Sequence, residues 1–256
     1  MRKKEAKPKI ISIVGLTASG KSSLGIKIAQ LFDGEIISAD SRQVYKGLDL
    51  GSGKVTQEEQ DMAVHHMLDV ACPLEYSKEG KYFDVFAFQQ LAYKTIDDIL
   101  ARGKVPIIVG GTGLYSRSVV EGYAFEETGK KNKSVPKYEV LQIALMPTKE
   151  WLLPRVELRL DQRLEEGMLD ELKDLLAKGV DPEWLKALGL EYYWNTAVVQ
   201  GEITKEEYRR WLVIRIMQFA KRQRTWFKKE QNTVFLQDDG VLEKESVRLV
   251  KEFLRD

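Results

Sequence analysis

Short apolar runs alternate with amphipathic stretches through the first 147 residues of the chain. Four of the runs predict buried strands, at residues 9–14, 35–39, 105–111 and 138–147. Apolar residues at helical spacing follow the first run and precede the third, at residues 22–32 and 86–103. Because strands that alternate with helices form parallel sheets covered on both faces, the pattern predicts an α/β fold.

Beyond Pro147 the pattern predicts helices almost without interruption. The clearest stretch, residues 204–230, opens with Thr204 and Glu207 at the spacing of a capping box. A late strand at 232–237 and a terminal helix at 243–256 follow. We expect one domain over residues 1–256, with the helix-rich portion at about 148–230 packed on the sheet.

Composition places few limits on function. The chain has 256 residues, 43% of them hydrophobic, and its 40 basic and 39 acidic residues leave a net charge of +1. That balance argues neither for nor against a polyanionic partner. One cysteine, Cys72, fits a reducing compartment, and the N-terminal apolar run is too short for a signal segment or a membrane span. We expect a cytoplasmic monomer that does not enter a membrane.

A phosphate-binding loop is predicted between the first strand and the first helix. Gly15, Gly20, Lys21 and Ser22 fit the pattern G-x-x-x-x-G-K-[ST], with Thr17, Ala18 and Ser19 between the glycines. In such a loop the backbone N–H groups converge on an anion, the lysine adds charge and the serine hydroxyl can ligate Mg²⁺. Kinases, ATPases and diphosphate-dependent transferases all use this loop, so it does not identify the substrate.

Asp40 follows the second predicted strand, at the carboxyl edge where open α/β sheets bind their ligands. A carboxylate at this position could act as a general base or lie beside Mg²⁺. It could equally cap a helix, because aspartate is common at that position. The residues alone leave these roles open.

Six blocks of sequence, read in order, resemble one family. They are "GLTASGKSS", "SADSRQVYKGLDLGSGK", "VHHMLDVACPLEYS", "ARGKVPIIVGGTGLY", "DQRLEEGMLDE" and "QFAKRQRTWFK". Their types and order are similar to those of the tRNA dimethylallyltransferases, also called isopentenyltransferases. The resemblance covers the chain from Ile10 to about Lys229.

The resemblance implies a P-loop kinase-like fold that transfers a dimethylallyl group from dimethylallyl diphosphate to N6 of an adenine in tRNA. Lys21 and Ser22 would hold the diphosphate and Mg²⁺, and Asp40 would accept the N6 proton. Thr112 would hydrogen-bond near the reacting groups, and Arg222 would face the leaving diphosphate. The residues implied for the adenine site are Ser41, Arg42 and Gln43, and those implied for the nucleic-acid path are Asp161, Gln162 and Arg163.

The chain departs from the family pattern at three places. Leu16 replaces the usual proline of the phosphate loop. Ile216 and Met217 stand where threonine and arginine are usual, and we expect Arg215 to supply the missing charge to the diphosphate. Residues 123–137 leave room only for a loop where the family inserts a helical lobe that holds the anticodon stem.

The missing lobe keeps other functions open. The acceptor could be a free adenine nucleotide, as in the related cytokinin-forming enzymes. A small-molecule P-loop kinase would use the same phosphate loop and bind ATP, but would leave the "DSRQVY" and "GGTGLY" blocks unexplained. A non-catalytic RNA-binding relic would account for Met217. The arginines at four-residue spacing in 155–163 and the basic helix 209–229 favour an RNA partner, although acidic residues interleave with the former.

Overall fold

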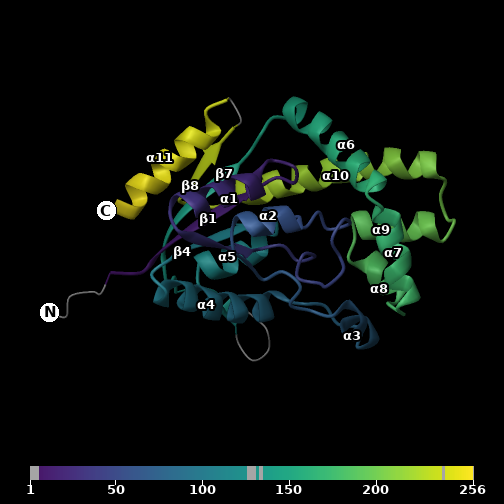
Figure 1. The fold of residues 1–256 in the computed structure, drawn as a ribbon, viewed down its shortest axis with the longest axis horizontal. Coiled ribbons are helices and arrows are strands. Elements are labelled where there is room, and N and C mark those ends of the chain that lie inside the picture. The colour runs from purple at the N-terminus through teal and green to yellow at the C-terminus, as the bar shows by residue number, and fades with distance from the viewer. Residues whose placement is uncertain (1–5, 126–130, 133–134, 238–239, 256) are drawn as a thin grey trace.

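The computed structural model describes residues 6–125, 131–132, 135–237 and 240–255. Its centre is a six-stranded parallel sheet in the order β3-β2-β4-β1-β7-β8 (Figure 1). The strands are β1 (Lys9–Gly15), β2 (Gly34–Ser38), β3 (His65–His66), β4 (Val105–Gly110), β7 (Glu139–Leu145) and β8 (Thr233–Leu236). All four strands expected from the longer apolar runs, and the late strand, are present.

Helices cover both faces of the sheet, which explains why its strands are almost continuously apolar. The first helix, α1 (Lys21–Leu31), and the last, α11 (Leu242–Arg255), pack on one face, where Ile13, Ile36 and Val250 are buried together. The other face is covered by α4 (Val85–Ala101) and α5 (Gly113–Val120). The predicted α/β fold class is therefore confirmed.

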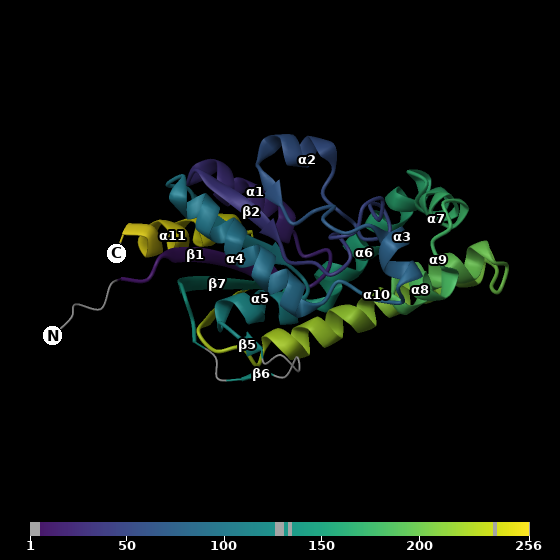
Figure 2. The same cartoon turned by 90° about the horizontal axis from the view of Figure 1, so that it is seen from below.

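The second half is helix-rich, as the sequence predicts. It contains α6 (Lys149–Glu165), α7 (Met168–Ala177), α8 (Pro182–Ala187), α9 (Glu191–Val199) and α10 (Lys205–Phe227). Thr204 and Glu207 form the expected capping box of α10. Figures 1 and 2 show α7, α8 and α9 at the end of the molecule opposite to both termini, beside the short helix α3 (Pro73–Lys78), and α10 running back from them towards α5.

Residues 123–137 contain two paired two-residue strands, β5 (Ala124–Phe125) and β6 (Lys131–Asn132). Residues 126–130 and 133–134 lie outside the described part of the chain. It therefore stays a prediction that this segment is only a loop in place of a lobe. That the chain is one domain also stays a prediction.

The topology brings three loops together at one edge of the sheet. Strands β1, β4 and β2 are neighbours and parallel, so their carboxyl ends meet. The loop after β1 is the phosphate loop, the loop after β2 carries Asp40, and the loop after β4 carries Thr112. Helices α6 and α10 pack against each other across this edge and supply its remaining walls.

Candidate active site

The phosphate loop has the backbone that its glycine pattern requires. Ala18 and Gly20 adopt left-handed φ values of 55° and 85°, which turn the chain sharply into α1. The Lys21 ammonium folds back and donates to the Leu16 carbonyl at 2.5 Å. The Ser19 hydroxyl is buried and has no hydrogen-bond partner among the residues that the structure describes. An orphaned buried hydroxyl in a loop of this shape is well suited to a bound anion.

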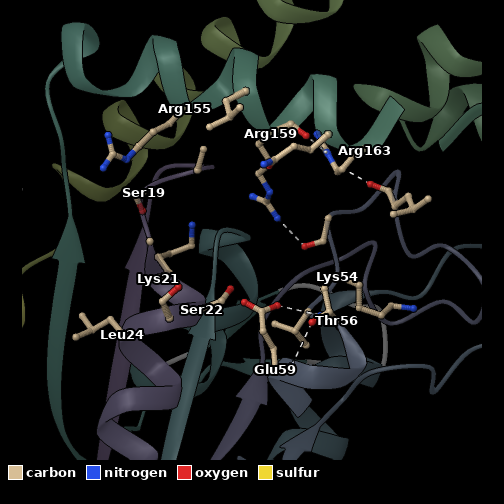
Figure 3. A pocket seen from close by; sticks show the side chains of 18 of the residues that line it. Ser19, Lys21, Ser22, Leu24, Lys54, Thr56, Glu59, Arg155, Arg159 and Arg163 are labelled. Atoms are coloured by element: carbon tan, nitrogen blue, oxygen red, sulfur yellow. Dashed lines mark hydrogen bonds between the residues drawn. The ribbon is translucent and has the colours of Figure 1, made fainter. Parts of the chain in front are cut away.

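Three arginines of α6 face the phosphate loop across a cavity of about 750 Å³. Figure 3 shows Arg159 reaching down from α6 towards Lys21 and Ser22, with Arg155 and Arg163 on either side of it. Arg159 donates to the Gly53 carbonyl at 2.8 Å, and Arg163 donates to the Leu50 carbonyl at 2.9 Å. The four-residue spacing places all three on one side of the helix.

The cations at this cavity affect one another's ionisation. Burial of the Lys21 ammonium, and then the Arg159 guanidinium, lower the pKa of Lys21 to about 7, while Asp40 opposes the shift. Burial and the neighbouring Arg163 also lower the pKa of Arg159. Burial and mutual repulsion disfavour the charged forms of Lys21 and Arg159. Cations held together in this way indicate a site for a polyanion.

Asp40 lies in a narrow cavity of about 70 Å³ that shares Lys21, Ser22 and Arg159 with the large one. Its Oδ1 accepts hydrogen bonds from the backbone N–H groups of Arg42 at 2.9 Å and Gln43 at 3.4 Å. Oδ2 has no hydrogen-bond partner among the described residues. The capping geometry therefore exists, but it fixes a turn, since no helix follows Asp40.

Two side chains connect the loops around this narrow cavity. The Thr112 hydroxyl accepts from the backbone N–H of Ser41 at 3.0 Å, joining the loops after β4 and β2. Gln223 of α10 accepts from the backbone N–H of Thr17 at 2.8 Å and donates to the Gly111 carbonyl at 3.1 Å. All three loops are thereby held in one arrangement.

Phe219 of α10 lines the narrow cavity, and its ring lies between two arginines. The Arg42 and Arg222 guanidinium groups lie 5.8 Å and 5.7 Å from the centre of the Phe219 ring. Arg42 also donates twice to the Leu188 carbonyl, at 2.8 Å and 3.2 Å. The site thus places a carboxylate between a group of cations and an aromatic ring, which suits a reaction in which an anionic group departs and a base removes a proton.

Comparison with known proteins agrees with this geometry. The family model for IPP transferase matches residues 43–135 and 124–230, and the model for isopentenyl transferase matches residues 8–71. The tRNA dimethylallyltransferase of Streptococcus uberis is 36% identical, covering 92% of this chain and 91% of the relative. The tRNA dimethylallyltransferase 2 of Shewanella sediminis is 35% identical, covering 86% and 89%.

The chain belongs to the tRNA dimethylallyltransferase family. Solved structures agree: the tRNA isopentenylpyrophosphate transferase of Bacillus halodurans superposes with a TM-score of 0.85 at 27% identity, covering 97% of both chains. The Staphylococcus epidermidis transferase gives 0.84 at 30% identity, covering 97% of this chain and 99% of that one. The alignment with the S. uberis relative runs over 286 residues, more than the 256 of this chain, so the relative carries residues without a counterpart here.

Most of the residues implied by the family resemblance lie together. The phosphate-loop residues Thr17 to Ser22, with Asp40, Arg42 and Gln43, line one or both of the connected cavities, as do Gln162 and Arg163. Gly15 ends β1 directly before the loop, and Ser41 and Thr112 meet beside Asp40.

Three predicted residues lie elsewhere. Arg215 is not brought to the phosphate loop: its guanidinium lies 5.8 Å and 5.9 Å from the rings of Trp194 and Trp211, and it lines neither of the connected cavities. Asp161 forms a two-point ion pair with Arg209, at 2.6 Å and 2.7 Å, on the exposed side of α6. Arg222 is exposed beside Phe219 and lines neither of the connected cavities.

Sequence reasoning assigned Arg159 only to a basic surface and did not single out Gln223. The four-residue spacing of 155–163 could have placed Arg159 on a single helix face, but not opposite Lys21. The contacts of Gln223 span 112 and 206 residues of sequence, which no local pattern reveals.

Among the described residues no group of three or more His, Cys, Asp or Glu could hold a metal ion. The Ser22 hydroxyl lines both connected cavities and has no hydrogen-bond partner in the described part of the chain. It therefore fits a metal ion whose other ligands come from a bound diphosphate. No helix within the described ranges is long and apolar enough to cross a membrane.

Proposed function

We propose that the connected cavities carry out the family's reaction, with the diphosphate in the large cavity and the acceptor amine in the narrow one. The chain is a prenyltransferase that moves a dimethylallyl group to N6 of an adenine in tRNA. The single observation that carries the assignment of residues is the position of Asp40, in a cavity that also contains Lys21 and Arg159.

The reaction needs a base on one side and cations on the other. The allylic C–O bond of dimethylallyl diphosphate breaks, and its electron pair leaves with the diphosphate. The N6 lone pair forms the new N–C bond, and one N6 proton passes to Asp40. An aryl amine is a weak nucleophile, so a positioned carboxylate and preorganised cations both lower the barrier.

On the donor side, Lys21, Arg159 and the backbone of the phosphate loop bind the diphosphate. The Ser19 hydroxyl, which has no partner within the described ranges, donates to one of the diphosphate oxygens. Ser22 would hold Mg²⁺ together with diphosphate oxygens. When bound, Mg²⁺ neutralises charge that develops on the leaving group.

On the acceptor side, the adenine enters past Phe219, and its edge meets Ser41, Gln43 and Thr112. The Gln43 side chain is fixed by Ser38, which donates to its Oε1 at 2.9 Å, and by its own donation to the Gly53 carbonyl at 3.2 Å. Arg42 and Arg222 flank the entrance, where they meet phosphates of the incoming strand. A tRNA acceptor implies a cytoplasmic enzyme.

The substitution Asp40→Asn tests this assignment. Asparagine keeps an oxygen that can accept the two backbone N–H bonds, but it cannot take up the N6 proton, so we expect transfer to tRNA to fall by about 100-fold or more. Binding of dimethylallyl diphosphate should stay within a few-fold of wild type. The exposed Lys251 of α11 offers a control, Lys251→Ala, with unaltered turnover. Turnover by Asp40→Asn close to that of wild type would remove Asp40 from the base role.

A further inference from the structure

Helix α10 carries a continuous exposed face beside the acceptor entrance. At three- and four-residue spacing this face presents Trp211, Arg215, Gln218, Arg222 and Trp226, and Lys229 follows just past the end of the helix. Such spacing keeps the side chains on one side of a helix. Phe219 and Gln223, which line the narrow cavity, lie on the adjoining side of the same helix.

The C-terminal end of this face is a cationic groove. A cavity of about 580 Å³ is lined by Arg117 of α5 and by Lys221, Arg222, Trp226 and Lys229. The last acidic residue before this region is Glu207, and none follows until Glu230. A stretch of this length without a carboxylate fits a polyanionic strand.

The N-terminal end of the face is an aromatic platform. The rings of Trp194 and Trp211 stack with centroids 6.2 Å apart and an interplanar angle of 11°, and Arg215 lies beside both. Trp211 is nevertheless 41% exposed, and Tyr193, which contacts Trp194 edge-on, is 45% exposed. An exposed, pre-stacked indole with a neighbouring guanidinium is suited to an unpaired base.

Phe219, where we propose that the acceptor adenine enters, lies between these two ends. Trp211 precedes Phe219 by eight residues, about 12 Å along a helix that rises 1.5 Å per residue. Figure 2 shows α10 extending from the region of α5 to α9, so the groove and the platform lie on opposite sides of the entrance. A strand whose adenine is inserted past Phe219 would continue in both directions along this helix.

We propose that the exposed face of α10 binds the unpaired tRNA strand on both sides of the acceptor adenine. The groove of Arg117, Lys221, Arg222 and Lys229 contacts its phosphates, and Trp211, supported by Trp194 and Arg215, stacks on a neighbouring base. This inference rests on the proposed function and adds a surface that holds the acceptor strand. Charge favours RNA over a protein partner, because the groove is lined by cations and the platform is bordered by Arg215.

Matched substitutions at Trp211 separate base stacking from packing of α9 on α10. We expect Trp211→Phe, which keeps a ring, to bind an unmodified tRNA transcript with a Kd near that of wild type. Trp211→Leu keeps apolar contact with Trp194 but has no aromatic face, and it should raise the Kd about ten-fold or more. Thermal unfolding midpoints of the two variants should agree, and the Lys251→Ala control should bind like wild type.

Two further readouts test the surface directly. Arg215→Ala should reduce the salt dependence of the tRNA Kd by about one counterion. Tryptophan fluorescence should be quenched on addition of tRNA, and less so in Trp211→Phe. An unchanged Kd in Trp211→Leu, with unchanged quenching in Trp211→Phe, would overturn this inference while the proposed function stands. A wild-type chain that neither binds nor prenylates tRNA would overturn both.

Discussion

Among single residues, Lys21 gives a direct test, because its protonation state should change near neutral pH. Its pKa is lowered to about 7 by burial and by Arg159, so in the free protein it loses its proton as the pH rises through 7. A diphosphate binds better to the ammonium form. We therefore expect the Kd for dimethylallyl diphosphate to rise between pH 6 and pH 9, with proton uptake on binding at pH 8, measurable by calorimetry in buffers of different ionisation enthalpy. Lys21→Arg should flatten the profile, and a Kd that does not change with pH in wild type would contradict the assignment.

Arg159 and Arg215 provide a paired residue-scale prediction. Arg159 lines both connected cavities with Lys21, whereas Arg215 lies beside two tryptophans. Arg159→Ala should weaken dimethylallyl diphosphate binding by about ten-fold or more, because a charge-assisted contact is lost. It should also shift the pH profile of binding upwards, since one cause of the low Lys21 pKa is removed. Donor affinity that falls equally in Arg215→Ala would instead support a diphosphate role for Arg215.

At the scale of elements, α7 holds the loop that covers the large cavity. Glu171 accepts hydrogen bonds from three successive backbone N–H groups, of Asp49, Leu50 and Gly51, at 2.9, 2.6 and 3.0 Å. The same loop supplies the Gly53 carbonyl that accepts from Arg159 and Gln43. Glu171 thus orders the loop that holds Arg159 and Gln43, although it contacts neither side chain.

Removal of this carboxylate should loosen the loop. We expect Glu171→Ala to lower the free energy of unfolding by about 2 kcal/mol, because three successive backbone N–H groups lose a charged acceptor. The KM for the donor should rise as well. Asp174→Ala, an exposed carboxylate on the same helix, should change neither in chemical denaturation and steady-state kinetics. Equal behaviour of the two variants would show that α7 does not order this loop.

The elements also show what sequence could predict. Apolar spacing and the capping box of Thr204 predict five strands of the sheet and the helices α1 and α10, because these signals are local. The two-residue strand β3 was not predicted. The phosphate loop was predictable for the same reason. The contact of Glu171 with residues 49–51 and the position of Arg159 over Lys21 were not, because they depend on how α6 and α7 pack over loops more than 100 residues away.

For the whole molecule, the charges of the proposed reaction lie around two cavities that share residues. Lys21 and Arg159 line both cavities, Asp40 lines the narrow one, and the exposed face of α10 extends the acceptor side. The net charge of +1 conceals this arrangement, because acidic residues elsewhere balance the cations.

A tRNA acceptor should therefore bind with a steep dependence on salt, whereas a free nucleotide that makes few phosphate contacts should respond weakly.

A comparison of acceptors tests whether this protein prenylates tRNA. The protein is incubated with dimethylallyl diphosphate and Mg²⁺ together with unmodified tRNA, or with AMP, ADP or ATP, and the nucleosides are then analysed by mass spectrometry. We expect adenosine from tRNA to gain one five-carbon unit on N6, and the free nucleotides to remain unmodified. A five-carbon unit on a free nucleotide but not on tRNA, or no transfer to any acceptor, would contradict the account.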